Sequence, residues 1–177
     1  MSETLREVFA EAVVAARVAE LGREVSAHYA GLGVGDGDVV MVGVLKGALP
    51  LMADLLRALS FCPNLDFVRV ASYGAGTAPG ALRFLMDLET DVAGRHVLVV
   101  EDIVDTGRSL AYLLSMLKAR SPASLKVCAL LDKAYRREVD VTVDFVGFEA
   151  PPVFLVGYGM DVGERLRRLR GVYELVR

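Results

Sequence analysis

The stretch from His96 to Leu110, HVLVVEDIVDTGRSL, constrains the fold of this chain more than any other segment. It begins with an uninterrupted apolar run, Val97 to Val100, which is typical of a strand buried on both faces of a parallel sheet. The run then breaks into carboxylates at Glu101, Asp102 and Asp105. Because ligands of open α/β sheets bind at the carboxyl ends of the strands, the stretch predicts a polar site at the end of a buried strand.

The rest of the chain alternates between apolar runs and segments with helical spacing of apolar residues. Helices are expected at residues 10–30, 48–59 and 109–119. Strands are expected at residues 39–45, 65–71, 82–88, 96–102 and 125–132, with a pair of short strands between 143 and 159. This alternation predicts an α/β fold with a mostly parallel central sheet flanked by helices. The length of 177 residues, without repeats or low-complexity linkers, predicts a single domain over residues 1–177.

Composition excludes several classes of protein. Hydrophobic residues make up 54% of the chain, but no uninterrupted apolar stretch is long enough to cross a bilayer. The acidic, amphipathic N-terminus does not resemble a targeting peptide, so a cytoplasmic location and no membrane partner are expected. The net charge of −3 argues against a nucleic-acid partner. Two isolated cysteines, Cys62 and Cys128, and two histidines do not predict a zinc site.

The residues that follow the apolar run are suited to binding an anion. Thr106, Gly107 and Ser109 stand at the start of the next expected helix, where backbone N–H groups and the helix dipole favour a phosphate. A helix cap without a ligand is the alternative for these residues alone. The three preceding carboxylates repel one another unless a cation or hydroxyl donors are present. A ribose 5-phosphate whose diol shares a Mg²⁺ ion would satisfy both features.

The segment VLVVEDIVDTGRS resembles the phosphoribosyl-pyrophosphate signature of type I phosphoribosyltransferases, and its E-D-I-V-D-T-G variant points to the hypoxanthine-guanine family. The resemblance implies the fold of that family, which adds a small hood built from the chain ends to the central sheet. Further matches occur in the family's order and cover nearly the whole chain after the first helix. They are Leu45–Gly47, Ser72–Gly74, Leu131–Lys133, Arg136-Arg137, Asp144–Glu149, Phe154–Tyr158 and Asp161.

The resemblance implies a role for each polar residue of the first stretch. Asp105 would be the catalytic residue, a general base near N7 of a purine. Glu101 and Asp102 would engage the ribose hydroxyls and, through water, Mg²⁺, while Asp161 would help to hold a second Mg²⁺. The residues implied to hold the 5′-phosphate are Thr106, Gly107, Arg108 and Ser109.

Other residues are implied to bind the base. Lys133 would donate to the 6-oxo group of a purine, Phe154 would stack on the ring, and backbone groups near Leu155 would read its edge. Each has an ordinary structural alternative: Lys133 could extend to water past an apolar strand, and Phe154 could belong to the core.

The implied pyrophosphate contacts come from three further segments. Arg167 would reach the pyrophosphate, but Arg165 and Arg168 are close competitors within a charged stretch. The loop Ser72–Ala81 is rich in glycine and would act as a lid that closes with Mg²⁺ and phosphoribosyl pyrophosphate. Its segment 77–80, Thr-Ala-Pro-Gly, departs from the family pattern of hydroxyl residues. The other residues implied to bind pyrophosphate are Lys46 and Gly47, after a cis peptide at Leu45–Lys46, and Ser72 and Tyr73.

The activity implied by the resemblance is transfer of a phosphoribosyl group from phosphoribosyl pyrophosphate to a 6-oxopurine, with Mg²⁺, in a homodimer or homotetramer. The alternatives are a phosphoribosyltransferase for xanthine or a pyrimidine, an RNA-binding regulator on the same fold, and a non-catalytic nucleotide-binding module. The sequence leaves open the choice between hypoxanthine and guanine and between dimer and tetramer.

Overall fold

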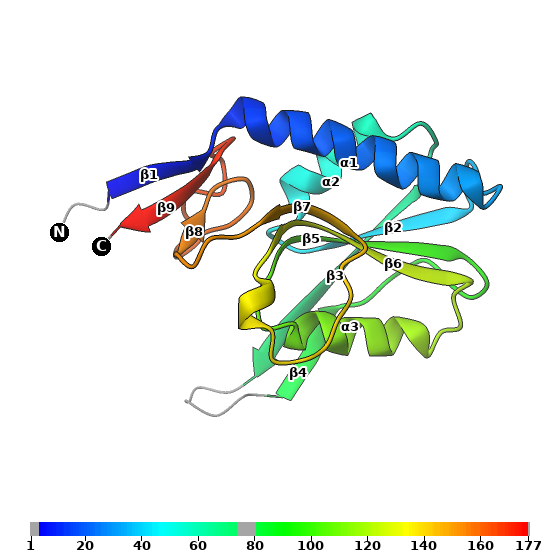
Figure 1. The fold of residues 1–177 in the computed structure, drawn as a ribbon. Helices are drawn as coiled ribbons and strands as arrows, with labels where there is room; N and C mark the ends of the chain where they lie inside the picture. Colours follow the sequence, from blue (N-terminus) through cyan, green and yellow to red (C-terminus); the bar gives the residue numbers. More distant parts are fainter. Residues whose placement is uncertain (1–3, 74–80, 177) are drawn as a thin grey trace.

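The computed structural model describes residues 4–73 and 81–176 (Figure 1). Its helices and strands follow the predicted order, with one strand added near each end of the chain. In chain order the elements are β1 (Thr4–Phe9), α1 (Glu11–Gly31), β2 (Val39–Val44), α2 (Leu49–Ala58), β3 (Asn64–Tyr73), β4 (Ala81–Met86), β5 (His96–Val104), α3 (Arg108–Lys118), β6 (Ser124–Asp132), the 3₁₀ turn η1 (Ala134–Arg136), β7 (Phe145–Glu149), β8 (Leu155–Val156) and β9 (Val172–Val176). No helix in the described ranges is long and apolar enough to cross a membrane.

The central sheet has six strands in the order β4-β3-β2-β5-β6-β7. All neighbouring strands are parallel except the β3–β4 pair at one edge, which is antiparallel. The predicted mostly parallel α/β fold is therefore confirmed. The carboxyl ends of β2, β5 and β6 meet at the same edge of the sheet, and this places the polar ends of three segments side by side.

The apolar runs of the central strands are buried on both faces because alternate side chains point in opposite directions. Val39 and Met41 pack with α1 and α2 on one face, whereas Val40 and Val42 pack with α3 on the other. Figure 1 shows the same layers, with α1 and α2 above the sheet and α3 below it. A continuous apolar run, rather than an alternating one, is the pattern that such a strand requires.

A second, three-stranded antiparallel sheet in the order β1-β9-β8 brings the two chain ends together beside the central sheet (Figure 1). This sheet and the connection 157–171 are called the hood below. The hood implied by the resemblance is confirmed. Its first strand was not expected from the sequence, because four of the six residues of β1 are exposed and carry no apolar alternation.

Two segments differ from their predicted bounds. The strand β5 continues to Val104, because its pairing with β6 extends to Val104 opposite Asp132. Ile103 and Val104 therefore extend the strand beyond its predicted end at Asp102. Ser72 and Tyr73 belong to the end of β3, and β4 begins at Ala81. Residues 74–80 of the expected lid, with the departure from the family pattern, lie outside the described residues.

Candidate active site

Two neighbouring cavities open at the carboxyl edge of the central sheet. The first, called the loop cavity, has a volume of about 240 Å³ and is lined mainly by Glu101–Gly107 with Ser109 and Leu110 at the start of α3. The second, called the hood cavity, has a volume of about 270 Å³ and lies between β5 and the hood. Its lining residues are Asp102, Ile103, Asp105, Lys133, Arg136, Phe154, Leu155, Met160 and Asp161. Asp102, Ile103 and Asp105 thus form the wall that the two cavities share.

The loop cavity ends at a tight turn that leads into α3. Gly107 has a φ of 83° and precedes the first helical residue. A Cβ atom at this position would lie 2.9 Å from the carbonyl oxygen of Val139, so the turn requires glycine for two reasons. The first N–H groups of a helix lack partners within the helix, and Ser109 and Leu110 line the cavity at that point. The geometry therefore suits a phosphate.

Arg108 is at the same turn, but its side chain extends along the surface. Its Nε lies 2.6 Å from Oε2 of Glu138, and both side chains are about half exposed. Its backbone N–H lies 3.4 Å from Oγ1 of Thr106. The guanidinium of Arg108 is therefore engaged at the surface, and Arg108 is not among the residues that line the loop cavity.

Glu101 and Asp102 are adjacent carboxylic acids whose carboxyl groups are buried. Burial raises the pKa of Glu101 well above its usual value, and the charge of Asp102 raises it further. Burial also raises the pKa of Asp102, although the hydrogen bond from the N–H of Ile103 and the charge of Arg167 oppose this shift. That N–H lies 2.9 Å from Oδ1 of Asp102. A cation or hydroxyl donors placed here would favour the ionised forms.

The two carboxylate oxygens of Asp105 differ in their surroundings. Its Oδ2 lies 3.2 Å from Nη1 of Arg136, in a pair of which both side chains are partly exposed. Its Oδ1 is buried and has no hydrogen-bond partner among the described residues. Because Asp105 lines both cavities, its carboxylate can accept a proton from a molecule that spans them.

The hood cavity combines a buried ammonium group with apolar groups. Lys133 is only 7% exposed, and its Nζ donates to the carbonyl oxygen of Val153 at 3.2 Å. Its backbone N–H bonds to the carbonyl of Val104, which fixes it beside the shared wall. Phe154 is 49% exposed, whereas Leu155 in β8 is buried. A planar ring with an acceptor near Lys133 would suit this cavity.

The residues expected to bind pyrophosphate border the cavities without lining them. The Leu45–Lys46 peptide is cis, and Nζ of Lys46 lies 3.0 Å from Oε2 of Glu164. Arg167 donates from Nη1 to the carbonyl of Gly159 at 2.7 Å, and its Nη2 lies 2.8 Å from Oδ1 of Asp161. Arg167 is therefore joined to Asp161, which lines the hood cavity.

Close backbone contacts connect the hood to the sheet at this point. A methyl group at Gly47 would overlap the carboxylate of Asp102, and one at Gly159 would overlap the carbonyl of Gly47. Both positions therefore require glycine in this arrangement. These glycines let the segment after β2 lie between β5 and the hood.

The sequence model of the phosphoribosyl transferase domain family matches residues 9–162, which is most of the chain. The chain belongs to the phosphoribosyltransferase family. The resemblance seen in the sequence is thus confirmed, and the relatives agree with it. A hypoxanthine phosphoribosyltransferase from Salmonella typhimurium is 43% identical over 177 residues, which cover 99% of this chain and 98% of that protein.

Solved structures of other phosphoribosyltransferases show the same fold. A hypoxanthine-guanine phosphoribosyltransferase from Bacillus anthracis is 32% identical, with a TM-score of 0.89 over 99% of this chain and 100% of that one. A hypoxanthine phosphoribosyltransferase from Trypanosoma cruzi, studied for the effect of its C-terminal region on oligomeric state and activity, is 38% identical. Its TM-score is 0.91 over 97% of this chain and 91% of that one.

Some residues at the site of this phosphoribosyltransferase were not assigned a role from the sequence. Arg136 lines the hood cavity and pairs with Asp105, and Arg137 donates to the carbonyl of Asp105. The two arginines three and four positions after Lys133 were a visible signal, because cations clustered beside a predicted site favour anionic partners. Gly159 had no comparable signal, since its partner lies more than a hundred positions earlier in the chain.

The expected magnesium ligands form no cage of protein groups. Among the residues that the structure describes, no cluster of three or more His, Cys, Asp or Glu could hold a metal by itself. Asp161 is already engaged by Arg167 and by the N–H of Glu164 at 2.8 Å. The groups near the cavities that could bind a metal are carboxylate oxygens. These suit an ion such as Mg²⁺, which keeps water and phosphate among its ligands. The site therefore fits Mg²⁺ bound together with a substrate.

Proposed function

We propose that this phosphoribosyltransferase transfers the 5-phosphoribosyl group of phosphoribosyl pyrophosphate to hypoxanthine or guanine, and releases pyrophosphate with IMP or GMP. The names of its relatives support this substrate class. The observation that carries the proposal is the carboxylate of Asp105 in the wall between the two cavities. One cavity ends at a helix N-terminus that suits a phosphate, and the other contains the buried ammonium of Lys133.

In the proposed reaction, the bond between C1′ of the ribose and pyrophosphate breaks, and its electron pair leaves with pyrophosphate. A bond forms between C1′ and N9 of the purine, and Asp105 accepts the proton from N7. The turn at Thr106–Ser109 holds the 5′-phosphate through backbone N–H groups and hydroxyls. Glu101 and Asp102 orient the ribose hydroxyls, so that C1′ lies at the shared wall.

Base recognition is assigned to the hood cavity. Lys133 offers only donors, so it pairs with the 6-oxo group of hypoxanthine or guanine. Phe154 provides a partly exposed ring on which the purine stacks, and the backbone near Leu155 contacts its edge. The 6-amino group of adenine is itself a donor and has no acceptor to meet there.

The pyrophosphate end of the site is assigned to basic groups that border the cavities. Lys46 and Arg167 lie on either side of Glu164 and neutralise the leaving group. Gly47 lets the main chain approach the pyrophosphate closely. Ser72 and Tyr73, at the end of β3, begin the loop proposed to cover the pyrophosphate. Glu101, Asp102 and Asp161 would hold Mg²⁺, which supplies positive charge to the leaving pyrophosphate when it is bound.

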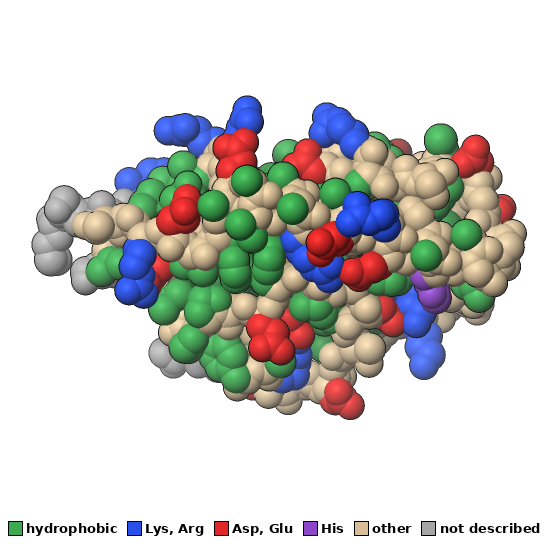
Figure 2. Space-filling view, turned by 45° about the horizontal axis from the view of Figure 1, so that its top comes forward, with side chains coloured by type: hydrophobic (Ala, Val, Ile, Leu, Met, Phe, Trp, Pro, Cys, Tyr) green, Lys and Arg blue, Asp and Glu red, His purple; other side chains and the backbone are tan. Residues whose placement is uncertain are grey.

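The expected partners are small molecules and a second copy of the chain. Basic and acidic side chains are interspersed on the face shown in Figure 2, which favours a small-molecule substrate over a nucleic acid. Assembly into a homodimer or homotetramer and a cytoplasmic location stay predictions from the sequence.

A steady-state assay with hypoxanthine, guanine, xanthine and adenine, each with phosphoribosyl pyrophosphate and Mg²⁺, tests the proposal. We expect turnover of hypoxanthine, guanine or both. We also expect adenine to be rejected by about 10⁴-fold in kcat/KM, as in sites where a buried polar group loses its partner. Comparable use of adenine and hypoxanthine would contradict the role of Lys133. Turnover of xanthine alone, or of none of the bases, would contradict the proposed substrate class.

A further inference from the structure

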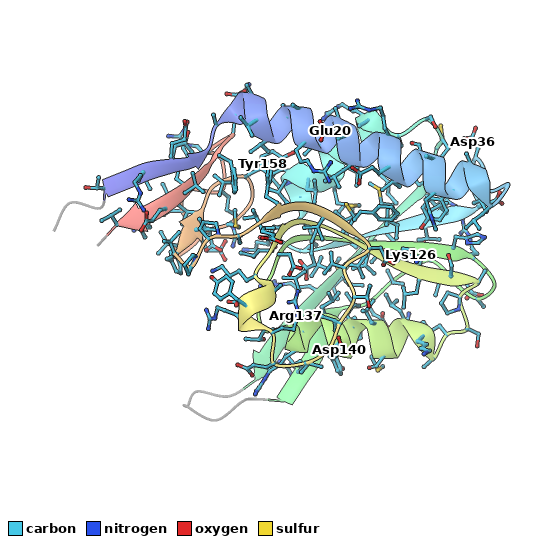
Figure 3. The ribbon with its side chains drawn as sticks, viewed as in Figure 1. Glu20, Asp36, Lys126, Arg137, Asp140 and Tyr158 are labelled. Atoms are coloured by element: carbon cyan, nitrogen blue, oxygen red, sulfur yellow. The ribbon has the colours of Figure 1, made fainter. Side chains whose placement is uncertain are left out.

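Arg137 connects the end of β6 to the turn that carries Asp105. Its side chain is only 15% exposed. Nη1 donates to the main-chain carbonyl oxygen of Asp105 at 2.7 Å, and Nη2 forms an ion pair with Oδ1 of Asp132. Figure 3 shows Arg137 just after the 3₁₀ turn, beside the start of α3. One guanidinium thus joins two segments that lie 27 positions apart in the chain, from Asp105 to Asp132.

The residues after Arg137 hold the same turn through the backbone. The N–H groups of Glu138 and Val139 both donate to the carbonyl of Thr106, at 2.9 and 3.3 Å. The stem of Arg137 also packs closely on Gly107, since a Cβ atom there would lie 2.9 Å from its Cδ. The turn from Asp105 to Gly107 is therefore fixed by residues that line neither cavity.

The carboxylate of Asp105 has little else to orient it. Its described side-chain contact is the partly exposed pair with Arg136, and exposed ion pairs are weak and easily exchanged with water. Its direction into the shared wall therefore depends on the position of its backbone. Arg137 controls that position through the carbonyl group, yet it is not among the residues that line either cavity.

We propose that Arg137 is a positioning residue for phosphoribosyl transfer, which acts by holding the main chain of Asp105 so that its carboxylate faces the reacting purine. This inference rests on the proposed role of Asp105 as the general base. A displacement of about 1 Å in such a group can lower a rate by about 10²-fold. Arginine suits the task because its planar fork bonds a carbonyl and a carboxylate at once, whereas lysine presents a single point charge.

The test is a double-mutant cycle of Arg137→Met and Asp105→Asn, read as the single-turnover rate of nucleotide formation. We expect Arg137→Met to lower this rate by roughly 10- to 10²-fold when Asp105 is present. In the Asp105→Asn background we expect a further loss of less than about threefold, since the group being positioned is already absent. Arg137→Lys should recover part of the rate, because it keeps the charge but not the fork.

Arg120→Met is the matched control. Arg120 donates from Nη2 to both carboxylate oxygens of Asp87, at 2.8 and 2.6 Å, and neither residue lines the two cavities. Its loss removes an arginine–carboxylate pair without touching the turn at Asp105. We expect a lower thermal unfolding temperature with an unchanged single-turnover rate for folded protein.

The outcomes separate the inference from the proposed function. An equal loss of rate from Arg137→Met in both backgrounds would mean a purely structural role, and an unchanged rate would also overturn the inference. A wild-type rate for Asp105→Asn alone would instead reject Asp105 as the base. If Arg137→Met does not fold, Asp132→Asn keeps the test open, because it loosens Arg137 without removing it. It should lower the rate by a smaller factor, again only when Asp105 is present, and any other pattern would overturn the inference.

Discussion

At the scale of single residues, Asp105 is distinguished by one buried oxygen without a hydrogen-bond partner among the described residues. If its carboxylate accepts the N7 proton, Asp105→Asn should lower kcat by roughly 10²- to 10⁴-fold. Binding of phosphoribosyl pyrophosphate should persist, because the turn at Thr106–Ser109, which is proposed to hold the 5′-phosphate, is unchanged. Steady-state kinetics and calorimetric titration measure the two quantities separately. A kcat equal to that of the wild type would reject the assignment.

Gly47 makes a second residue-scale prediction. A methyl group at this position would overlap the carboxylate of Asp102, so Gly47→Ala forces the loop or the carboxylate to move. We expect kcat/KM for phosphoribosyl pyrophosphate to fall by about 10²-fold, as for other displacements of about 1 Å in a site.

Gly31→Ala is the matched control for that substitution. Gly31 ends α1, and a Cβ atom there would meet nothing within 4 Å. Its kinetics should equal those of the wild type. Equal kinetics for Gly47→Ala as well would show that the close approach to Asp102 has no functional role.

At the scale of elements, the side chain of Asp66 joins β3 by hydrogen bonds to the segment that follows β4. Its Oδ2 accepts the N–H groups of Thr90 at 2.7 Å and Glu89 at 3.1 Å, and its Oδ1 accepts that of Phe67 at 2.7 Å. Burial by itself would raise the pKa of Asp66, but hydrogen bonds from Thr90, Phe67 and Glu89 outweigh it and lower the pKa below its usual value.

Because the pKa of Asp66 is lower in the folded state than in the unfolded chain, the carboxylate stabilises the fold above about pH 4. This contribution is lost as the pH falls through the folded-state pKa. Asp66→Asn should lower the free energy of unfolding at pH 7 by about 1–3 kcal/mol and should reduce its loss on acidification.

Urea unfolding between pH 3 and 7 measures both effects. Asp91→Asn is the control, because the exposed Asp91 accepts a single local bond from the N–H of Ala93. Equal pH dependence of wild type and Asp66→Asn would show that Asp66 does not contribute to acid sensitivity.

At the scale of the whole molecule, the hood cavity is bounded by the central sheet on one side and by the hood on the other. A ligand that spans it contacts Asp102 and Asp105 from β5 and the turn after it, and Leu155, Met160 and Asp161 from the hood. Binding to the folded state alone stabilises it by mass action, by about 2.7 kcal/mol at a ligand concentration of 100 Kd.

For a chain of this size, that stabilisation corresponds to a rise in Tm of roughly 5–11 °C. We expect this rise with phosphoribosyl pyrophosphate and Mg²⁺ together, and most of it should disappear on addition of EDTA. Thermal scans with each component alone provide the control. A Tm that does not respond to the pair, or a shift that survives EDTA, would contradict joint binding of metal and substrate.

The order and type of most elements and the phosphate turn were predictable from the sequence because they depend on local patterns. Continuous apolar runs mark strands buried on both faces, and the residues from Asp105 to Ser109 form their turn within five adjacent positions. The placement of β1 was not predictable, since its partner β9 is at the opposite end of the chain. Likewise, only the tertiary structure joins Arg137 to the carbonyl of Asp105 and places Gly159 against the carbonyl of Gly47. Each of these contacts has a main-chain oxygen of a distant residue as its partner. Every residue type carries such an oxygen, so the sequence contains no local signal for which partner is chosen.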